Sequence, residues 1–129
     1  MGLHARDDYL QLQGVPLQMQ DLAGHSVIGF DQENAFIRSL AIKGFERSAF
    51  AISSDSDLAQ LALIRAGAGI GGCQVQLAKR DPRLRRVLPD GFALKLDTWV
   101  TMHEDLRNSP RCRVTFDALV QGLQRYVQD

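Results

Sequence analysis

The sequence predicts a single α/β domain whose largely parallel sheet carries helices on both faces. Residues 26–45 and 49–66 each run from a short apolar stretch through a polar loop into a stretch with apolar residues at helical spacing. Strands that alternate with helices in this way are typical of parallel sheets, because the helix returns the chain to the start of the next strand. The chain has 129 residues, 45% of them hydrophobic and 23% charged, which suits one globular domain with its own core.

The first part of the chain predicts two strands with a short helix between them. Residues 1–5 form a short apolar run and predict the first strand. A short helix follows, which Asp7 or Asp8 can cap and Gly14 ends. Residues 26–30 are a compact apolar run between polar neighbours, as expected of a buried strand.

The middle of the chain repeats the order of strand, loop and helix. Apolar residues at helical spacing predict a helix over 34–45, and 49–52 predicts the next strand. A loop rich in capping residues then leads into a predicted helix over 57–66. The glycine-rich stretch 70–75 predicts a strand that packs closely against its neighbours.

The last part predicts a charged connector, a strand and a long helix. Residues 79–86 are rich in arginine and are interpreted as a solvated connector, a phosphate contact being the alternative. Residues 93–102 alternate apolar and polar side chains, which is the clearest strand pattern in the chain. Pro110 stands in the first turn of a helix that runs to Tyr126.

Charge and cysteine content exclude several classes of function. Fifteen Lys and Arg balance fifteen Asp and Glu, without the basic excess of a nucleic-acid-binding domain. Cys73 and Cys112 form no CxxC pair and the three histidines are scattered, so we expect no disulfide scaffold, no metal site and no cofactor. No apolar stretch approaches the ~20 residues of a membrane span. No signal peptide opens the sequence, so we expect a cytoplasmic protein.

Two patterns that resemble cofactor or catalytic sites have structural explanations. Residues 67–72 fit G-x-G-x-x-G, but the dinucleotide fingerprint needs a strand before it and a helix after it, and the predicted order here is reversed. Helix termination followed by a tightly packed strand is the better interpretation. Cys73 with His4, His25 or His103 could form a thiol nucleophile and its base. A lone cysteine on a buried strand usually behaves as a small hydrophobic residue, so no catalytic residue is predicted.

Two predicted loops lie where open α/β sheets bind ligands. In such sheets the ligand site is beyond the carboxyl ends of the strands, where helix starts offer free N–H groups and the positive end of the helix dipole. The candidate ligand-binding residues in these loops are Phe30, Asp31, Gln32, Glu33, Ser53, Ser54, Asp55 and Ser56. The alternative is that Ser54 and Asp55 serve only as helix caps.

The order of short motifs along the chain resembles that of LysR-type bacterial transcription regulators. The motifs are GVP at 14–16, DLAGH at 21–25, a capped helix ending in RAGAGIG at 54–71, DTWVTMHEDLR at 97–107 and SPR at 109–111. Each motif alone is weak, whereas their order and spacing cover essentially the whole chain. Gln74 stands where many members of the family have proline.

The resemblance implies a sensing domain folded like type 2 periplasmic binding proteins, with two α/β lobes and an effector cleft between them. It implies that residues 1–108 are the second lobe and 109–129 a return helix toward the first lobe. Most of the first lobe and the DNA-binding helix-turn-helix have no counterpart in this sequence, so DNA binding would depend on an absent domain.

The implied function is non-enzymatic sensing of a small, often anionic, organic effector through the two candidate loops. A surface left uncovered by the first lobe should be apolar, so we also expect self-association. The alternatives are a stand-alone solute-binding domain and, third, a small α/β enzyme.

Overall fold

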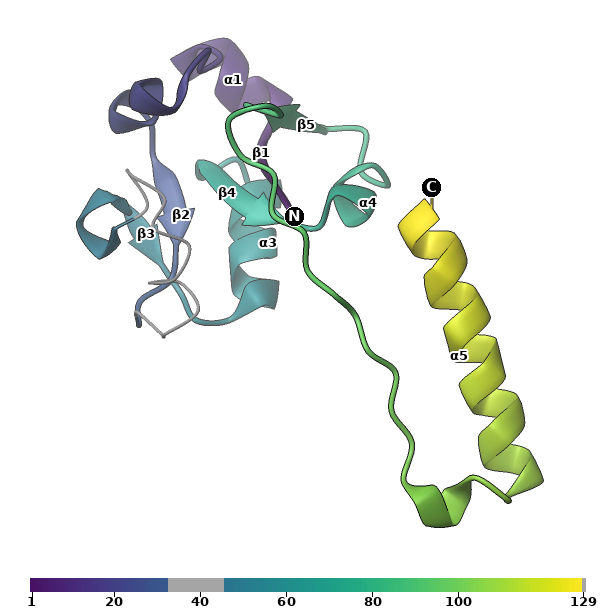
Figure 1. The fold of residues 1–129 in the computed structure, drawn as a ribbon. Helices are drawn as coiled ribbons and strands as arrows, with labels where there is room; N and C mark the ends of the chain where they lie inside the picture. Colours follow the sequence, from purple (N-terminus) through teal and green to yellow (C-terminus); the bar gives the residue numbers. More distant parts are fainter. Residues whose placement is uncertain (33–45, 129) are drawn as a thin grey trace. The chain divides into compact units, whose positions relative to one another are not determined.

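The computed structural model describes residues 1–32 and 46–128 of the chain (Figure 1). The chain divides into two compact units, Met1–Lys95 and Leu96–Asp129. The helix predicted over 34–45 and the candidate residue Glu33 lie outside the described residues.

The described part of the first unit contains a five-stranded sheet with the strand order β3-β2-β4-β1-β5 (Figure 1). The strands are β1 (Gly2–Arg6), β2 (Val27–Gly29), β3 (Ile52–Ser53), β4 (Ile70–Cys73) and β5 (Leu84–Val87). Strand β2 runs parallel to both β3 and β4, whereas β1 runs antiparallel to β4 and β5. The predicted α/β class is confirmed, and the parallel part of the sheet is the part formed by β3, β2 and β4.

Helices cover both faces of this sheet, as predicted. The helical segments of the first unit are α1 (Asp7–Gln13), the 3₁₀ turns η1 (Met19–Gly24) and η2 (Arg47–Ala49), α3 (Asp57–Arg65) and α4 (Val75–Ala78). Side chains alternate between the faces along each strand, so Val27 and Ile28 belong to two different core clusters. On one face α1, η1 and Phe92 cover the strands, and on the other α3 and α4 do so.

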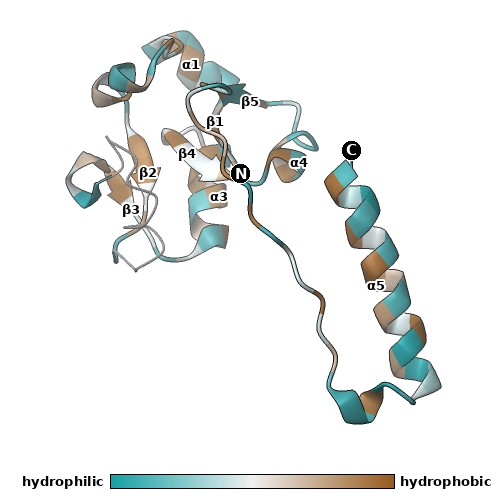
Figure 2. Cartoon of the chain, in the orientation of Figure 1, coloured by the Kyte–Doolittle hydropathy of each residue, from teal (hydrophilic) through white to brown (hydrophobic). Residues whose placement is uncertain are grey.

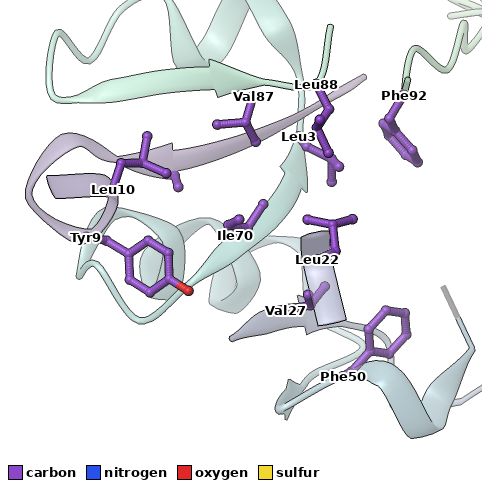
Figure 3. Packing of buried hydrophobic residues seen from close by; sticks show 11 residues of the cluster. Leu3, Tyr9, Leu10, Leu22, Val27, Phe50, Ile70, Val87, Leu88 and Phe92 are labelled. Atoms are coloured by element: carbon purple, nitrogen blue, oxygen red, sulfur yellow. The ribbon is translucent and has the colours of Figure 1, made fainter. Parts of the chain in front are cut away.

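The larger core cluster lies on the face covered by α1 and η1 (Figure 3). Its members are Leu3, Ala5, Tyr9, Leu10, Leu22, Val27, Phe50, Ile70, Val87, Leu88 and Phe92. Figure 2 shows hydrophobic residues along β2 and β3 and in part of β4. Burial of these side chains from water is the main force that holds the five strands together.

The predicted cap of the first helix is wrong, although its end is correct. The N-cap residue of α1 is Arg6, and no side chain caps the helix start. Strand β1 continues directly into α1, so Asp7 and Asp8 already lie in the first turn, where they favour the positive end of the helix dipole. Asp8 also pairs with the Arg6 guanidinium. Gly14 ends α1 with a φ of 85°, as expected of a glycine at this position.

The glycine run at 67–72 ends α3 and allows β4 to pack closely. Gly67 adopts a φ of 77° just after α3. A Cβ atom on Gly69 would lie 2.2 Å from the Ser26 carbonyl oxygen, and one on Gly71 would lie 2.9 Å from the Ile64 side chain. Both neighbours leave no room for a side chain, which confirms helix termination followed by a tightly packed strand.

The interpretation of 79–86 as a connector is wrong in part, because β5 begins at Leu84 and pairs along β1. In the described sheet β5 is an edge strand, and Arg85 and Arg86 are exposed. Charged residues are common on edge strands, where they discourage pairing with other chains. They also remove the hydrophobic run by which a strand is recognised in a sequence.

The described part of the second unit contains the 3₁₀ turn η3 (Glu104–Leu106) and the long helix α5 (Pro110–Gln128). The predicted carboxy-terminal helix is therefore confirmed. The predicted strand over 93–102 is wrong: a single bridge joins Ala93 to Gly2, and residues 94–103 contain no strand. An alternating apolar and polar pattern indicates which side chains favour burial. A strand forms only where a neighbouring backbone segment pairs with it through hydrogen bonds. Trp99 is 84% exposed.

Candidate functional site

The two candidate loops lie side by side at the carboxyl ends of the parallel strands β2 and β3. In the strand register Ile28 is opposite Ile52 and Gly29 is opposite Ser53. Beyond the strand ends the Ser54 backbone N–H donates to the Gly29 carbonyl at 2.9 Å, which continues the pairing into the loops. The sheet therefore brings together two segments that are far apart in the sequence.

Asp55 connects the second loop to the first. Its Oδ1 atom accepts hydrogen bonds from the backbone N–H groups of Asp31 and Gln32, both at 3.0 Å. Two N–H donors stabilise the negative charge of a carboxylate, and the carboxylate in turn holds the donating backbone in place. Asp55 thus sets the conformation of the loop after β2.

Helix α3 is capped by Ser56, so the alternative in which Ser54 and Asp55 act only as caps is wrong. The Ser56 side chain accepts a hydrogen bond from the Ala59 N–H at 3.3 Å. The Ser54 hydroxyl accepts instead from the Ser56 N–H at 3.3 Å, inside the loop. Ser56 therefore caps the helix, whereas Asp55 makes the contact between the two loops.

Two further residues support these loops, and no sequence pattern pointed to either of them. Gln60 on α3 is 3% exposed, and its side-chain amide donates to the Ser54 carbonyl at 2.6 Å. Arg47 on η2 donates to Asp31 Oδ1 from Nε at 3.1 Å and from Nη2 at 2.9 Å. Residue 47 lies just before the segment predicted as a strand and is 16 positions from Asp31, so no local pattern links the two.

The remaining candidate residues differ in exposure. Phe30 is half-buried, whereas Asp31 and Gln32 are exposed. The Ser53 hydroxyl oxygen is buried, and within the described residues it has no hydrogen-bond partner. The structure thus brings seven of the eight candidates to one edge of the sheet, and Glu33 lies outside the described residues.

Cys73 and His4 are neighbours across the β4–β1 pair, but their chemistry is that of a structural contact. The Cys73 Sγ atom lies 3.3 Å from His4 Nδ1, which also lies 3.0 Å from the Gly2 carbonyl oxygen. Burial raises the pKa of the Cys73 thiol to about 11 and lowers the pKa of His4. The thiolate is the nucleophilic form of cysteine, so a thiol this weakly acidic is a poor nucleophile at neutral pH.

A second charged cluster surrounds Asp81, which precedes β5 in the chain. Strand β5 lies at the opposite end of the strand order from β3. Arg83 forms a two-point contact with the Asp81 carboxylate, with Nε and Nη2 both at 3.0 Å, and Arg65 Nε lies 3.5 Å away. The hydrogen bond from Arg83 is the largest cause that lowers the pKa of Asp81. Arg83 also lines a shallow pocket with Arg6, Asp7, Asp8, Gln11 and Pro82. Both arginines of this pocket are already paired with carboxylates of the chain.

Comparisons with known proteins agree with this architecture. Residues 1–124 match the LysR substrate binding domain. The regulatory domain of CrgA, a LysR-type transcriptional regulator from Neisseria meningitidis, is similar with a TM-score of 0.70 and 23% identity, covering 95% of this chain and 63% of that one. A second CrgA structure gives a TM-score of 0.69 and 22% identity, with coverages of 95% and 44%.

A third solved structure is more distant. The regulatory domain of AphB from Vibrio vulnificus, treated with cumene hydroperoxide, gives a TM-score of 0.52 and 17% identity, and covers 68% of this chain and 48% of that one. None of the curated proteins compared with this chain matches it. No helix in the described residues is both long and apolar enough to cross a membrane.

The family match, together with the fold, identifies a domain of the substrate-binding class. The chain belongs to the LysR substrate binding domain family, whose match extends over nearly its whole length. It shares its fold with the CrgA regulatory domain and spans 63% of the length of that domain.

Proposed function

We propose that this chain senses a small organic effector that carries an anionic group, through the loops that follow β2 and β3. The family assignment and the position of the loops at the carboxyl ends of parallel strands support this proposal. The strongest support is the contact of Asp55 with the backbone of Asp31 and Gln32, because that contact holds the two loops together as one surface. The proposed site consists of Phe30, Asp31, Gln32, Glu33, Ser53, Ser54, Asp55 and Ser56.

In this proposal the effector acts by a shift between two arrangements of a larger regulator. A ligand changes such an equilibrium only by the difference between its affinities for the two states. Asp55 lies two residues before the start of α3, so a ligand at the loops would act on α3 through a short path. Residues 1–108 would form one lobe of the sensor and 109–129 the return helix toward a first lobe, and DNA would be bound by a separate helix-turn-helix.

The proposal extends to the state of the chain in solution. Without a first lobe the cleft has one wall, so the isolated chain should bind its effector weakly. The apolar side chains exposed on α5, Val114, Leu119 and Val127, favour self-association. The compartment in this proposal is the cytoplasm.

Induction curves of a full-length regulator that contains this domain test the proposal. Replacing Gln32 or Ser54 by alanine should change the effector concentration that gives half-maximal induction. The matched control is Gln124→Ala, which removes an exposed glutamine side chain from α5. Unchanged curves for both loop variants, with normal thermal stability, would contradict the proposal.

A metabolite screen separates sensing from the two alternative functions. Thermal stabilisation of the chain by a compound that is recovered unchanged supports a binding domain, because a ligand stabilises the state that it binds. Conversion of the stabilising compound into a product would instead establish the small α/β enzyme. A stand-alone solute-binding domain would bind its ligand tightly without any first lobe.

A further inference from the structure

The Arg47–Asp31 ion pair provides two opposite charges at the rim of the proposed site. Arg47 donates from Nε and from Nη2, and both hydrogen bonds go to Oδ1 of Asp31. Asp31 Oδ2 and Arg47 Nη1 take no part in this contact. The side chains are 47% and 58% exposed. Exposed ion pairs contribute little to stability, so a ligand can open this pair at small cost.

Further acidic residues lie in the described loops and directly beside them. Asp55 lies against the backbone of Asp31, and Asp57 begins α3 two residues later. The described residues of the two loops, of 46–49 and of the start of α3 therefore carry four carboxylates, those of Asp31, Glu46, Asp55 and Asp57, and one guanidinium, that of Arg47. A ligand with only a negative charge would meet repulsion from the carboxylates, whereas a ligand with both charges would not raise the local net charge.

We propose that the effector is a zwitterion of the amino-acid class, and this rests on the proposed function. Its carboxylate binds Arg47 and its ammonium group binds Asp31, so one internal ion pair is exchanged for two pairs with the ligand. A carboxylate with two oxygens can accept two parallel N–H bonds from the guanidinium, which is a better geometry than two bonds to the single oxygen Oδ1. The Asp55 contact keeps the Asp31 backbone in place during this exchange.

The test uses the 129-residue chain and the standard L-amino acids. Each amino acid is compared with its N-acetyl derivative, which lacks the ammonium charge, and with its carboxamide, which lacks the carboxylate. Backbone amide signals of Asp31, Gln32 and Asp55 are followed by NMR during titration, which detects millimolar dissociation constants. At least one amino acid should move these signals, and both of its derivatives should bind at least about tenfold more weakly.

Two single substitutions then separate a zwitterion from a simple anion. Arg47→Gln should abolish binding in either case. Asp31→Asn should weaken the amino acid at least about tenfold, because the ammonium group loses its partner. For a simple anion the same substitution should strengthen binding, since it removes a competitor for Arg47 and a repelling charge. The control variants are Arg107→Gln and Glu104→Gln, which remove an exposed ion pair in the second unit.

Each outcome is decisive for this inference. Stronger binding by Asp31→Asn, or equal binding of the N-acetyl derivative, overturns the zwitterion while the proposed function stands. If no amino acid changes the signals, the zwitterion is also overturned. The proposed function is then tested separately by the induction curves of the Gln32 and Ser54 variants. Unchanged melting temperatures of the Arg47 and Asp31 variants show that both are folded.

Discussion

The two units of this chain contain similar amphipathic patterns but differ in what those patterns achieve. In the first unit Leu3, Ile64 and Ile70 are 0% exposed. In the second unit no described residue of α5 is buried, and Val114 is 70% exposed. An apolar pattern therefore becomes a core only where the chain also supplies a partner surface. The hydrogen bonds of a helix are local, so α5 forms without such a partner, whereas the strand predicted over 93–102 does not form.

The largest expected difference between the units concerns their apolar side chains. Ile64→Ala should lower the free energy of unfolding by about 2–5 kcal/mol, because it leaves a cavity between α3 and the sheet. Leu119→Ala on α5 should change it by less than about 0.5 kcal/mol, since this side chain is half exposed. Urea denaturation of the two variants measures both values. Similar losses would show that α5 is as well packed as the first unit.

A second comparison uses glycines in the two units. Gly69→Ala places a Cβ atom against the Ser26 carbonyl oxygen, and the overpacking should cost about 1–3 kcal/mol. Gly122→Ala on α5 has open space around it and should stabilise the helix by up to about 1 kcal/mol. Thermal denaturation of both variants should thus give shifts of opposite sign. A neutral Gly69→Ala would contradict the close packing of β4 against the segment before β2.

The cap of α3 gives a smaller expected effect. Ser56→Ala removes the acceptor for the Ala59 N–H and should cost about 1 kcal/mol of unfolding free energy. Ser48→Ala, an exposed serine on η2, is the matched control and should be neutral. If the two variants proved equally stable in urea, the assignment of the cap to Ser56 would be wrong.

The smallest effect is confined to a window of pH. Burial lowers the pKa of His4 below its ordinary value of 6.5, so the unfolded chain binds the proton more readily than the folded one. The free energy of unfolding should therefore fall as the pH drops below 6.5, and level off below the folded-state pKa. Urea titrations between pH 7.5 and pH 5 measure this slope. His4→Gln should flatten it, and an unchanged slope would assign it to other groups.

Much of the first unit could be predicted from the sequence because its signals are local. Residues 26–30 and 57–66 show a compact apolar run and a capped amphipathic helix, and both elements are present as β2 and α3. Strand β5 was not predicted, because its exposed arginines mask the hydrophobic pattern of an edge strand. The pairing of β1 with β4 is long-range and has no sequence signal of its own.

The candidate site could be predicted in its position but not in its contacts. The rule that ligands bind at the carboxyl ends of parallel strands pointed to the two loops, and the β2–β3 register brings them together. The roles of Asp55 and Arg47 depend on which backbone groups face them after folding, and residue type alone does not encode this. The choice of Ser56 over Ser54 as the cap likewise depends on where α3 begins.

The most direct test of the account is to map where a stabilising small molecule binds. A compound that raises the melting temperature of the chain is titrated into isotopically labelled protein, and its effect on each backbone amide signal is measured. The account predicts the largest changes at Asp31, Gln32, Ser54 and Asp55. Changes confined to the pocket between Arg6 and Arg83, or to α5, would contradict it.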